Sequence, residues 1–190
     1  MAKKYLLFLV LAAGVATGAF AQSLWSIGGG LVFDTGSLAS GESWVGGQTA
    51  STSLRQTGFG AGVFVDATFV ELSLALMRAS RTLECSLRGE LWSRSGTLLD
   101  ATLLGKLPIF LGWGDIFPLL GLGGKLGISE YVENGLSLRI VFGVGSDVDL
   151  TRNMFVRASL LGSYRFPTGE WDWLDGGWGV TIRAGFGLRL

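Results

Sequence analysis

The segment LSLRIVFGVGSDV at residues 136–148 decides the fold class of this chain. Its side chains alternate, with apolar residues at almost every even position and Ser, Arg, Gly or Asp at most odd ones. A period of two places the two kinds of side chain on opposite faces of an extended strand. Strands of soluble proteins typically run about 5–6 residues, whereas a membrane-spanning strand needs roughly 9–11. The length therefore favours a strand that crosses a membrane with its apolar face toward lipid.

The same alternation recurs in seven further segments, which makes eight predicted strands. An even number of antiparallel strands, apolar outside and small or polar inside, is typical of membrane barrels. We therefore expect an all-β fold, an eight-stranded antiparallel up-and-down transmembrane β-barrel. The eight segments are residues 25–34, 57–66, 70–77, 99–107, 119–128, 136–148, 154–166 and 178–190.

The connections between these segments differ in length, as expected for short turns on one side of a membrane and longer loops on the other. Residues 35–56 and 78–97 predict long polar outer loops, and residues 167–177 predict a shorter acidic one. Short or medium connections are expected at residues 67–68, 108–118, 129–135 and 149–153.

Aromatic residues fall toward the two ends of the predicted strands, as rings do at the two surfaces of a membrane. A soluble core would not sort its rings in this way, so the pattern supports the barrel. The predicted outer belt contains Phe33, Phe59, Tyr164, Phe166 and Trp178, and the predicted periplasmic belt contains Trp25, Phe69, Trp113, Phe117 and Phe186.

The first 21 residues have the features of a secretory signal peptide. Lys3 and Lys4 precede an apolar stretch at residues 5–15, and Ala19-Phe20-Ala21 is a small-x-small cleavage pattern. An anchor helix is the alternative, but the apolar stretch is short against the roughly 20 residues that span a bilayer. We therefore expect export, cleavage after residue 21 and a barrel domain at residues 22–190.

Composition and charge exclude several classes of function. The chain has 15 basic and 15 acidic residues and no histidine. Loss of Lys3 and Lys4 with the signal peptide leaves 13 − 15 = −2, so nucleic acid is not an expected partner. Without histidine, catalysis by a histidine base and His/Cys metal sites are not expected. Cys85 is the sole cysteine, which excludes an internal disulfide and leaves its role open. We expect no enzyme activity and no cofactor.

The last strand carries the most specific motif. The end of the chain, Arg183-Ala-Gly185-Phe-Gly-Leu188-Arg-Leu190, resembles the C-terminal signal by which the barrel assembly machinery recognises outer-membrane barrels. Together with the signal peptide and eight strands, the chain resembles small bacterial barrels of the OmpA-transmembrane, OmpX and OmpW type. Segments around Lys106 and Pro118 are similar to small barrel proteins of spirochaetes. The resemblance implies a monomer in outer-membrane lipid of a bacterium with two membranes.

Charged residues in the inward phase form the first candidate site, and two interpretations stay open. One is a salt-bridge network that plugs the interior, because a barrel of eight strands is just wide enough for side chains to fill it. The other is a narrow porin-like channel, because inward glycines such as Gly28, Gly145 and Gly187 add no side chain; four bases against two acids would then favour anions. The predicted lumen charges are Glu71, Asp100, Lys125, Arg139, Arg157 and Arg183.

Tryptophans in the predicted outer loops form the second candidate site. Trp92 lies within residues 78–97, and Trp171 and Trp173 lie within residues 167–177. Exposed tryptophans can mark recognition surfaces, although they can also belong to the membrane interface or pack loop on loop. The sequence thus predicts a structural or surface-interaction role, with a host surface as a partner, and a channel for small solutes as the alternative.

Overall fold

The computed structural model describes residues 25–45, 48–128, 136–166 and 175–190. Within these ranges no helix is long and apolar enough to cross a membrane. The strands are β1 (Trp25–Val45), β2 (Gln48–Ala67), β3 (Val70–Cys85), β4 (Gly89–Lys106), β5 (Ile109–Leu111), β6 (Gly114–Gly127), β7 (Leu136–Asp149), β8 (Met154–Arg165) and β9 (Asp175–Arg189).

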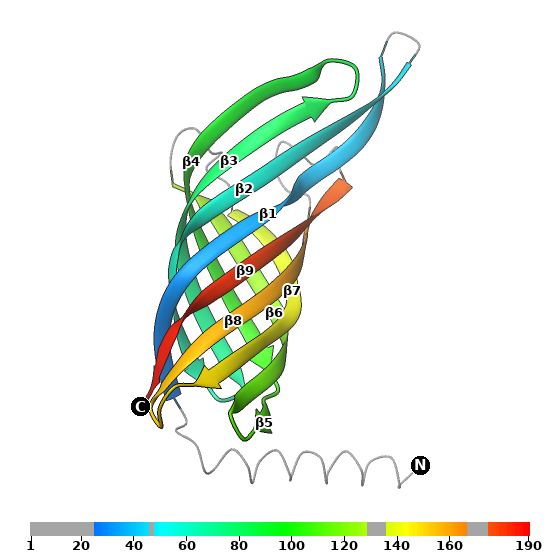
Figure 1. Cartoon of the computed structure of the whole chain (residues 1–190). Helices are drawn as coiled ribbons and strands as arrows, with labels where there is room; N and C mark the ends of the chain where they lie inside the picture. Colours follow the sequence, from blue (N-terminus) through cyan, green and yellow to red (C-terminus); the bar gives the residue numbers. More distant parts are fainter. Residues whose placement is uncertain (1–24, 46–47, 129–135, 167–174) are drawn as a thin grey trace, which may run out of the picture.

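Eight of these strands form a closed antiparallel ring (Figure 1). The hydrogen-bonded order is β4-β3-β2-β1-β9-β8-β7-β6, and pairing of β4 with β6 closes the ring. The short β5 pairs only with β6 and lies outside the ring. Closure gives every ring strand two partners, which removes the free sheet edges of an open sheet. The eight-stranded antiparallel barrel predicted from the sequence is therefore confirmed.

The outside of the barrel is apolar and the inside is polar or tightly packed. In β7, Leu138, Ile140 and Phe142 are exposed on the outer face, whereas Arg139 and Val141 are buried inside. The other predicted strands have the same inward and outward phases, so the period of two assigned the faces correctly. A soluble protein would hide such a wide apolar surface, and here it suits contact with lipid.

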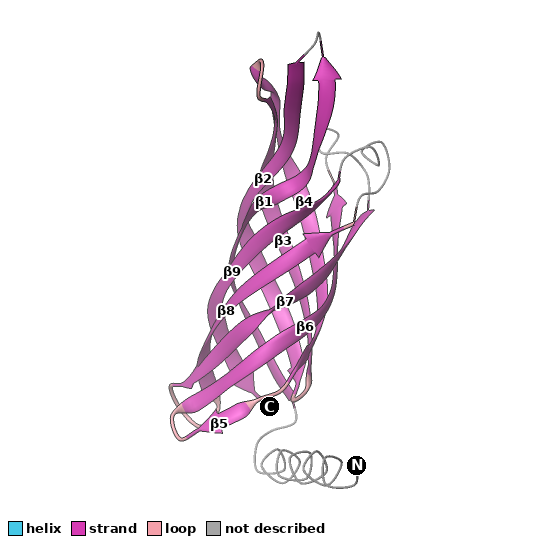
Figure 2. Cartoon of the chain, turned by 90° about the vertical axis from the view of Figure 1, so that its right-hand side faces the viewer, coloured by secondary structure: helices cyan, strands magenta, loops and turns pink. Residues whose placement is uncertain are grey.

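The two ends of the barrel differ. We call the end with the turns at residues 67–70 and 149–154 the turn end; both Trp25 and Leu190 lie there, because the Leu190 amide donates to the Trp25 carbonyl at 3.0 Å. The opposite end is the hairpin end, where β1 to β4 rise beyond the other strands (Figure 2). β5 lies at the turn end.

Two predicted outer loops are wrong, because most of their residues are strands. Residues 35–56 continue β1 and β2, and residues 78–97 continue β3 and β4. Beyond Asp34 the outward residues become hydroxyl-bearing instead of apolar, so the hydropathy alternation ends while the strand continues. Thr suits strands nearly as well as Val does, and backbone pairing extends as far as Val45 with Gln48.

The predicted connection at residues 108–118 is also shorter than expected. It contains all of β5, and β6 already begins at Gly114. The tight turns at residues 67–68 and 149–153 are confirmed, whereas residues 129–135 lie outside the described part of the chain.

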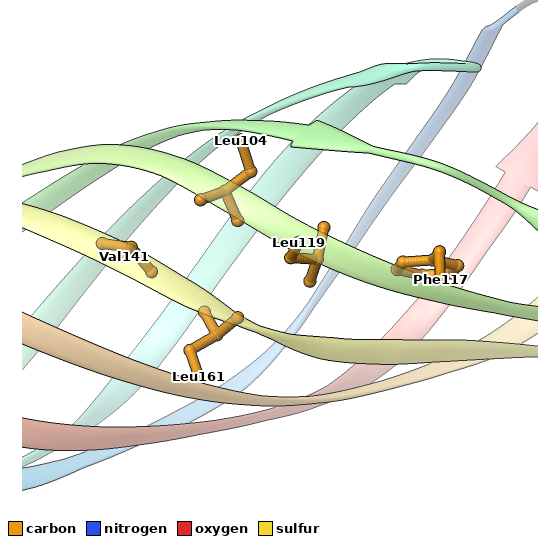
Figure 3. Packing of buried hydrophobic residues seen from close by; sticks show 5 residues of the cluster. All are labelled: Leu104, Phe117, Leu119, Val141 and Leu161. Atoms are coloured by element: carbon orange, nitrogen blue, oxygen red, sulfur yellow. The ribbon is translucent and has the colours of Figure 1, made fainter. Parts of the chain in front are cut away.

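The interior holds an apolar cluster that extends from the turn end into the middle of the barrel. Leu104, Phe117, Leu119, Val141 and Leu161 pack together from β4, β6, β7 and β8 (Figure 3). Phe117 is fully buried, so its expected place in the periplasmic aromatic belt is wrong. β6 begins at Gly114, so Phe117 lies within the strand and takes one of its inward positions. The sequence pattern had placed Phe117 in the connection at residues 108–118.

Candidate functional site

The lower charge cluster, at the turn end of the lumen, is organised around Arg157 on β8. Arg157 donates to Asp147 at 2.6 and 2.7 Å, to Asp66 at 2.7 Å and to Glu71 at 2.8 Å. Lys106 bonds the same carboxylate of Asp66. Because one guanidinium presents five donors in a fixed fork, it can serve acids from three strands together. Arg157 thus connects β8 to β2, β3 and β7 across the barrel interior.

Three phenylalanine rings surround the Arg157 guanidinium. Its carbon lies 4.3 Å from the ring centroid of Phe64 and 5.2 Å from those of Phe117 and Phe155. A cation over aromatic faces is stabilised by the ring quadrupole, more so when water is excluded. The rings therefore fill the turn end of the lumen and hold the cation among them.

The inward glycines are the positions against which these rings pack. A Cβ atom at Gly28 would lie 2.3 Å from Phe64. At Gly145 it would lie 2.2 Å from Phe117, and at Gly187 2.2 Å from Phe155. Such separations are well inside van der Waals contact. The absent side chains at these three positions therefore leave no open passage, which corrects the expectation that glycines empty the lumen.

The upper charge cluster lies toward the hairpin end and centres on Asp34 and Asp100. Arg139 donates to both oxygens of Asp100, at 2.5 and 2.7 Å. Asp34 pairs with Lys125 and accepts a 2.7 Å hydrogen bond from Thr181. Both contacts come from one nitrogen, Nη2 of Arg139. Charge-assisted hydrogen bonds are stronger than neutral ones, and each of these acids has a charged partner.

Arg183 lies between the two clusters and borders a small cavity. It donates to Ser73 at 2.7 Å and to Thr102 at 3.0 Å, and lies 3.5 Å from Glu71. The cavity is about 30 Å³ in volume, and Ser159 lines it together with these side chains. That volume corresponds to about one water molecule. A second, smaller pocket of about 10 Å³ lies beside Asp34, Lys125 and Arg165. Both are large enough for water only.

The structure places all six predicted lumen charges inside the barrel. The predicted count of four bases and two acids is incomplete, because further acids and further bases share the inward phase. Arg165, Arg183 and Arg189 also face inward, although they are only partly buried. Asp34, Asp66 and Asp147 occupy inward positions of their strands, and that phase was the signal that could have found them. Among the described residues the buried acids are Asp34, Asp66, Glu71, Asp100, Asp115 and Asp147, and the buried bases are Arg81, Lys106, Lys125, Arg139 and Arg157.

The remaining predicted residues lie elsewhere. Trp92 is half-buried against Leu54 and Leu83, with the Arg94 guanidinium 5.4 Å from its ring. Trp171 and Trp173 lie outside the described residues. The free Cys85 ends β3 at the tip of a hairpin. Trp92 thus packs against β2 and β3 and is not a free surface ring.

The residues of the C-terminal motif lie in or next to β9. Arg183, Gly185 and Leu188 belong to this strand, which pairs with both β1 and β8, and Leu190 follows it with an exposed side chain. Leu188 is also exposed, on the outer face. The structure therefore places the apolar residues of the motif on the surface that would face lipid.

A ring of eight antiparallel strands, apolar outside and ion-paired inside, decides the type of fold. The chain folds as an eight-stranded antiparallel β-barrel with an apolar outer face. Among the residues that the structure describes, no group of three or more acidic or cysteine side chains could hold a metal ion.

Comparison with known proteins gives structural likeness only. No protein-family model and no curated protein matches the chain. The structure of Ail, the attachment invasion locus protein of Yersinia pestis, in complex with the heparin analogue sucrose octasulfate is similar at 14% identity and a TM-score of 0.43, covering 87% of this chain and 99% of Ail. The translocator domain of the autotransporter NalP from Neisseria meningitidis is similar at 13% identity and a TM-score of 0.31, covering 100% of this chain and 96% of that domain. The strand pairing of the chain itself establishes the fold.

Proposed function

We propose that this protein is a non-enzymatic barrel of the bacterial outer membrane with a closed lumen and a surface-interaction role. The single observation that supports the surface role is a sheet that projects beyond the closed barrel. Export by the signal peptide at residues 1–21 and insertion through the C-terminal motif would bring the barrel to that membrane. No cofactor is part of the proposal.

The projecting sheet consists of the upper parts of β1 to β4. β2 pairs with β3 as far as Thr52 with Cys85, and β3 pairs with β4 as far as Cys85 with Gly89. Pairing of β4 with β6 stops at Leu98 with Gly127. A further backbone hydrogen bond joins the Ile128 amide to the Thr97 carbonyl at 2.9 Å. Residues 89–96 of β4 therefore extend past the described part of β6, and among the described strands they pair with β3 alone.

A sheet edge of this kind can add an extended peptide of a partner as a further strand. Its outer position, on rigid strands above an apolar belt, would present that edge away from the membrane. A partner on a host surface is consistent with this arrangement. The ion pairs and rings that fill the lumen support a plugged barrel over the alternative, a narrow channel for small solutes.

Shortening one hairpin tests the proposed surface role. Arg81 and Arg94 are in register on β3 and β4, so residues 82–93 can be replaced by an Asn-Gly turn without disturbing the strands below. We expect cells that display this variant to lose binding to immobilised extracellular-matrix proteins relative to the wild type. Binding at the wild-type level would contradict the proposal.

Two controls separate recognition from folding. Heat-modifiable migration on gels shows whether the shortened barrel is still folded. Thr68→Gly changes the turn at the opposite end, where Thr68 has a positive φ of 37° that glycine adopts readily. This variant should bind as the wild type does, because it leaves the projecting sheet intact.

A further inference from the structure

The outward face of β1 to β4 changes sharply from apolar to polar at one boundary. Below it the outward residues belong to the apolar belt, for example Phe59 and Leu76, which are both more than half exposed. The first polar outward residues are Thr35 on β1, Thr57 on β2, Arg78 on β3 and Thr97 on β4. The boundary crosses four neighbouring strands, and the polar face is continuous with the surface that contacts lipid.

Above this boundary the face carries hydroxyl groups almost without interruption. Except at Arg55, Arg78 and Glu84, the outward positions in residues 35–37, 51–57, 78–84 and 93–97 are all Ser or Thr. Neighbouring hydroxyls on this face approach across strands, at 3.4 Å for Thr35 with Thr57 and 3.2 Å for Thr82 with Ser93. We call this surface the hydroxyl face.

Arg78 is the residue on this face with the clearest capacity for a ligand. Its side chain is exposed and forms no ion pair or hydrogen bond with the described residues. It is in register with Phe59, at the upper limit of the apolar belt. Arg55, higher on β2, lies 3.7 Å from Glu84 and is itself largely exposed. The two guanidinium groups lie toward the apolar belt, whereas the outward carboxylates Glu42, Glu84 and Glu90 lie toward the tip of the sheet, so positive charge is confined to the part of the face next to the belt.

These groups suit a phosphorylated sugar better than a protein surface. Guanidinium binds phosphate with paired, charge-assisted hydrogen bonds. Serine and threonine hydroxyls both donate and accept, which matches the hydroxyl groups of a sugar. Short side chains on a rigid sheet also lose little conformational freedom when they are covered. The position directly above the lipid-facing belt is where lipid head groups lie.

We propose that the hydroxyl face binds the head group of a phosphorylated glycolipid in the outer leaflet. Arg78 contacts a phosphate at the edge of the hydrocarbon, Arg55 contacts a second anionic group above it, and the hydroxyls contact the sugars. The inference rests on the part of the proposed function that places the barrel in a membrane with its hairpin end outward. It does not depend on a host partner.

The probe is lipid A, compared with its dephosphorylated form. The whole protein is isolated in detergent micelles, and native mass spectrometry measures how much of either lipid stays bound. We expect the wild type to retain the phosphorylated form preferentially and Arg78→Gln to retain about fivefold less, the effect of one arginine near a charged lipid surface. Arg78→Lys should restore much of the retention, because it keeps the charge.

A matched control comes from the opposite end of the barrel. Arg152 is also exposed, in the turn between β7 and β8, so Arg152→Gln removes an equal charge far from the hydroxyl face and should leave retention unchanged. Equal loss in both variants, or equal retention in Arg78→Gln and the wild type, would overturn the proposal. A barrel that binds lipid A as proposed but shows no binding to matrix proteins would instead contradict only the surface-interaction role.

Discussion

At the scale of single residues, Arg157 contributes most to the interior of this barrel. It is buried, contacts three carboxylates and lies among three phenylalanine rings. A buried charge without a partner costs several kcal/mol. Arg157 and its three carboxylates therefore stabilise one another. Removal of Arg157 would leave more than one buried carboxylate without a compensating positive charge.

Substitution of Arg157 should strongly destabilise the protein. We expect Arg157→Met to lower the free energy of unfolding by about 3–5 kcal/mol, since it breaks buried ion pairs from one side. Arg157→Lys should lower it less, because lysine keeps the charge but loses the fork of donors. Urea titration in micelles measures both. An unchanged midpoint for Arg157→Met, with Arg152→Met as the surface control, would show that the lower charge cluster contributes no net stability.

Glycine at position 145 is required by the ring that covers it. Gly145→Ala would place a Cβ 2.2 Å from the Phe117 ring, and we expect a loss of about 1–3 kcal/mol from overpacking. Adding Phe117→Leu should recover part of that loss, because the two side chains compete for one space. Gly112→Ala is the control, since no atom lies within 4 Å of its Cβ position. Full stability of Gly145→Ala in urea titration would contradict the filled lumen.

At the scale of elements, the main departure from a simple barrel is the unequal length of the strands. β1 and β2 run through 21 and 20 residues, whereas β8 has 12. The extra length forms the projecting sheet, which has no closed ring to protect its edges. The lower part of β4 therefore pairs with a strand on each side, whereas its upper part pairs with β3 alone among the described strands.

Amide exchange should distinguish the two parts of β4. Residues 98–106 pair with β3 and β6, so we expect uniformly slow exchange there. Residues 89–96 pair with β3 alone among the described strands, and alternate amides of an antiparallel edge lack a ladder partner. We expect alternating fast and slow exchange in that part, measured by NMR in micelles. Residues 53–57 of β2, paired on both sides, provide the slow reference, and uniform protection of residues 89–96 would show that their edge is covered.

At the scale of the whole molecule, the structure favours a closed barrel. Acids in the described lumen pair with bases across strands, and rings occupy the turn end. The cavity beside Arg183, about 30 Å³, does not amount to a passage for solutes. Side chains thus fill most of the centre of the molecule.

Conductance in a planar bilayer tests this conclusion directly. We expect the folded, heat-modifiable protein to show no steady openings in a salt gradient, because a conducting path would require the ion pairs around Arg139 and Arg157 to separate. Steady openings would instead establish the channel. In that case Arg139→Glu should shift the ion selectivity, because it reverses a charge at the upper charge cluster.

The sequence by itself determined the barrel, its strand number and the face that each side chain takes. These follow from a period of two that lipid on one side and a narrow lumen on the other impose on every strand. Inward positions such as Arg139 and Glu71 could thus be identified without a structure, because phase alone places them. The C-terminal insertion motif and the signal peptide rest on local patterns of the same kind and stay predictions.

Only the tertiary structure decided which inward residues meet and where the strands end. Arg157 and Asp66 are 91 positions apart, and their contact depends on the tilt and stagger of strands around the ring. The sequence pattern did not show how far β1 to β4 extend beyond the closed ring, because Ser and Thr replace the outward apolar residues while backbone pairing continues. Whether Gly145 leaves a gap or receives a ring likewise depends on Phe117 from the next strand, and no pattern within a single strand contains that information.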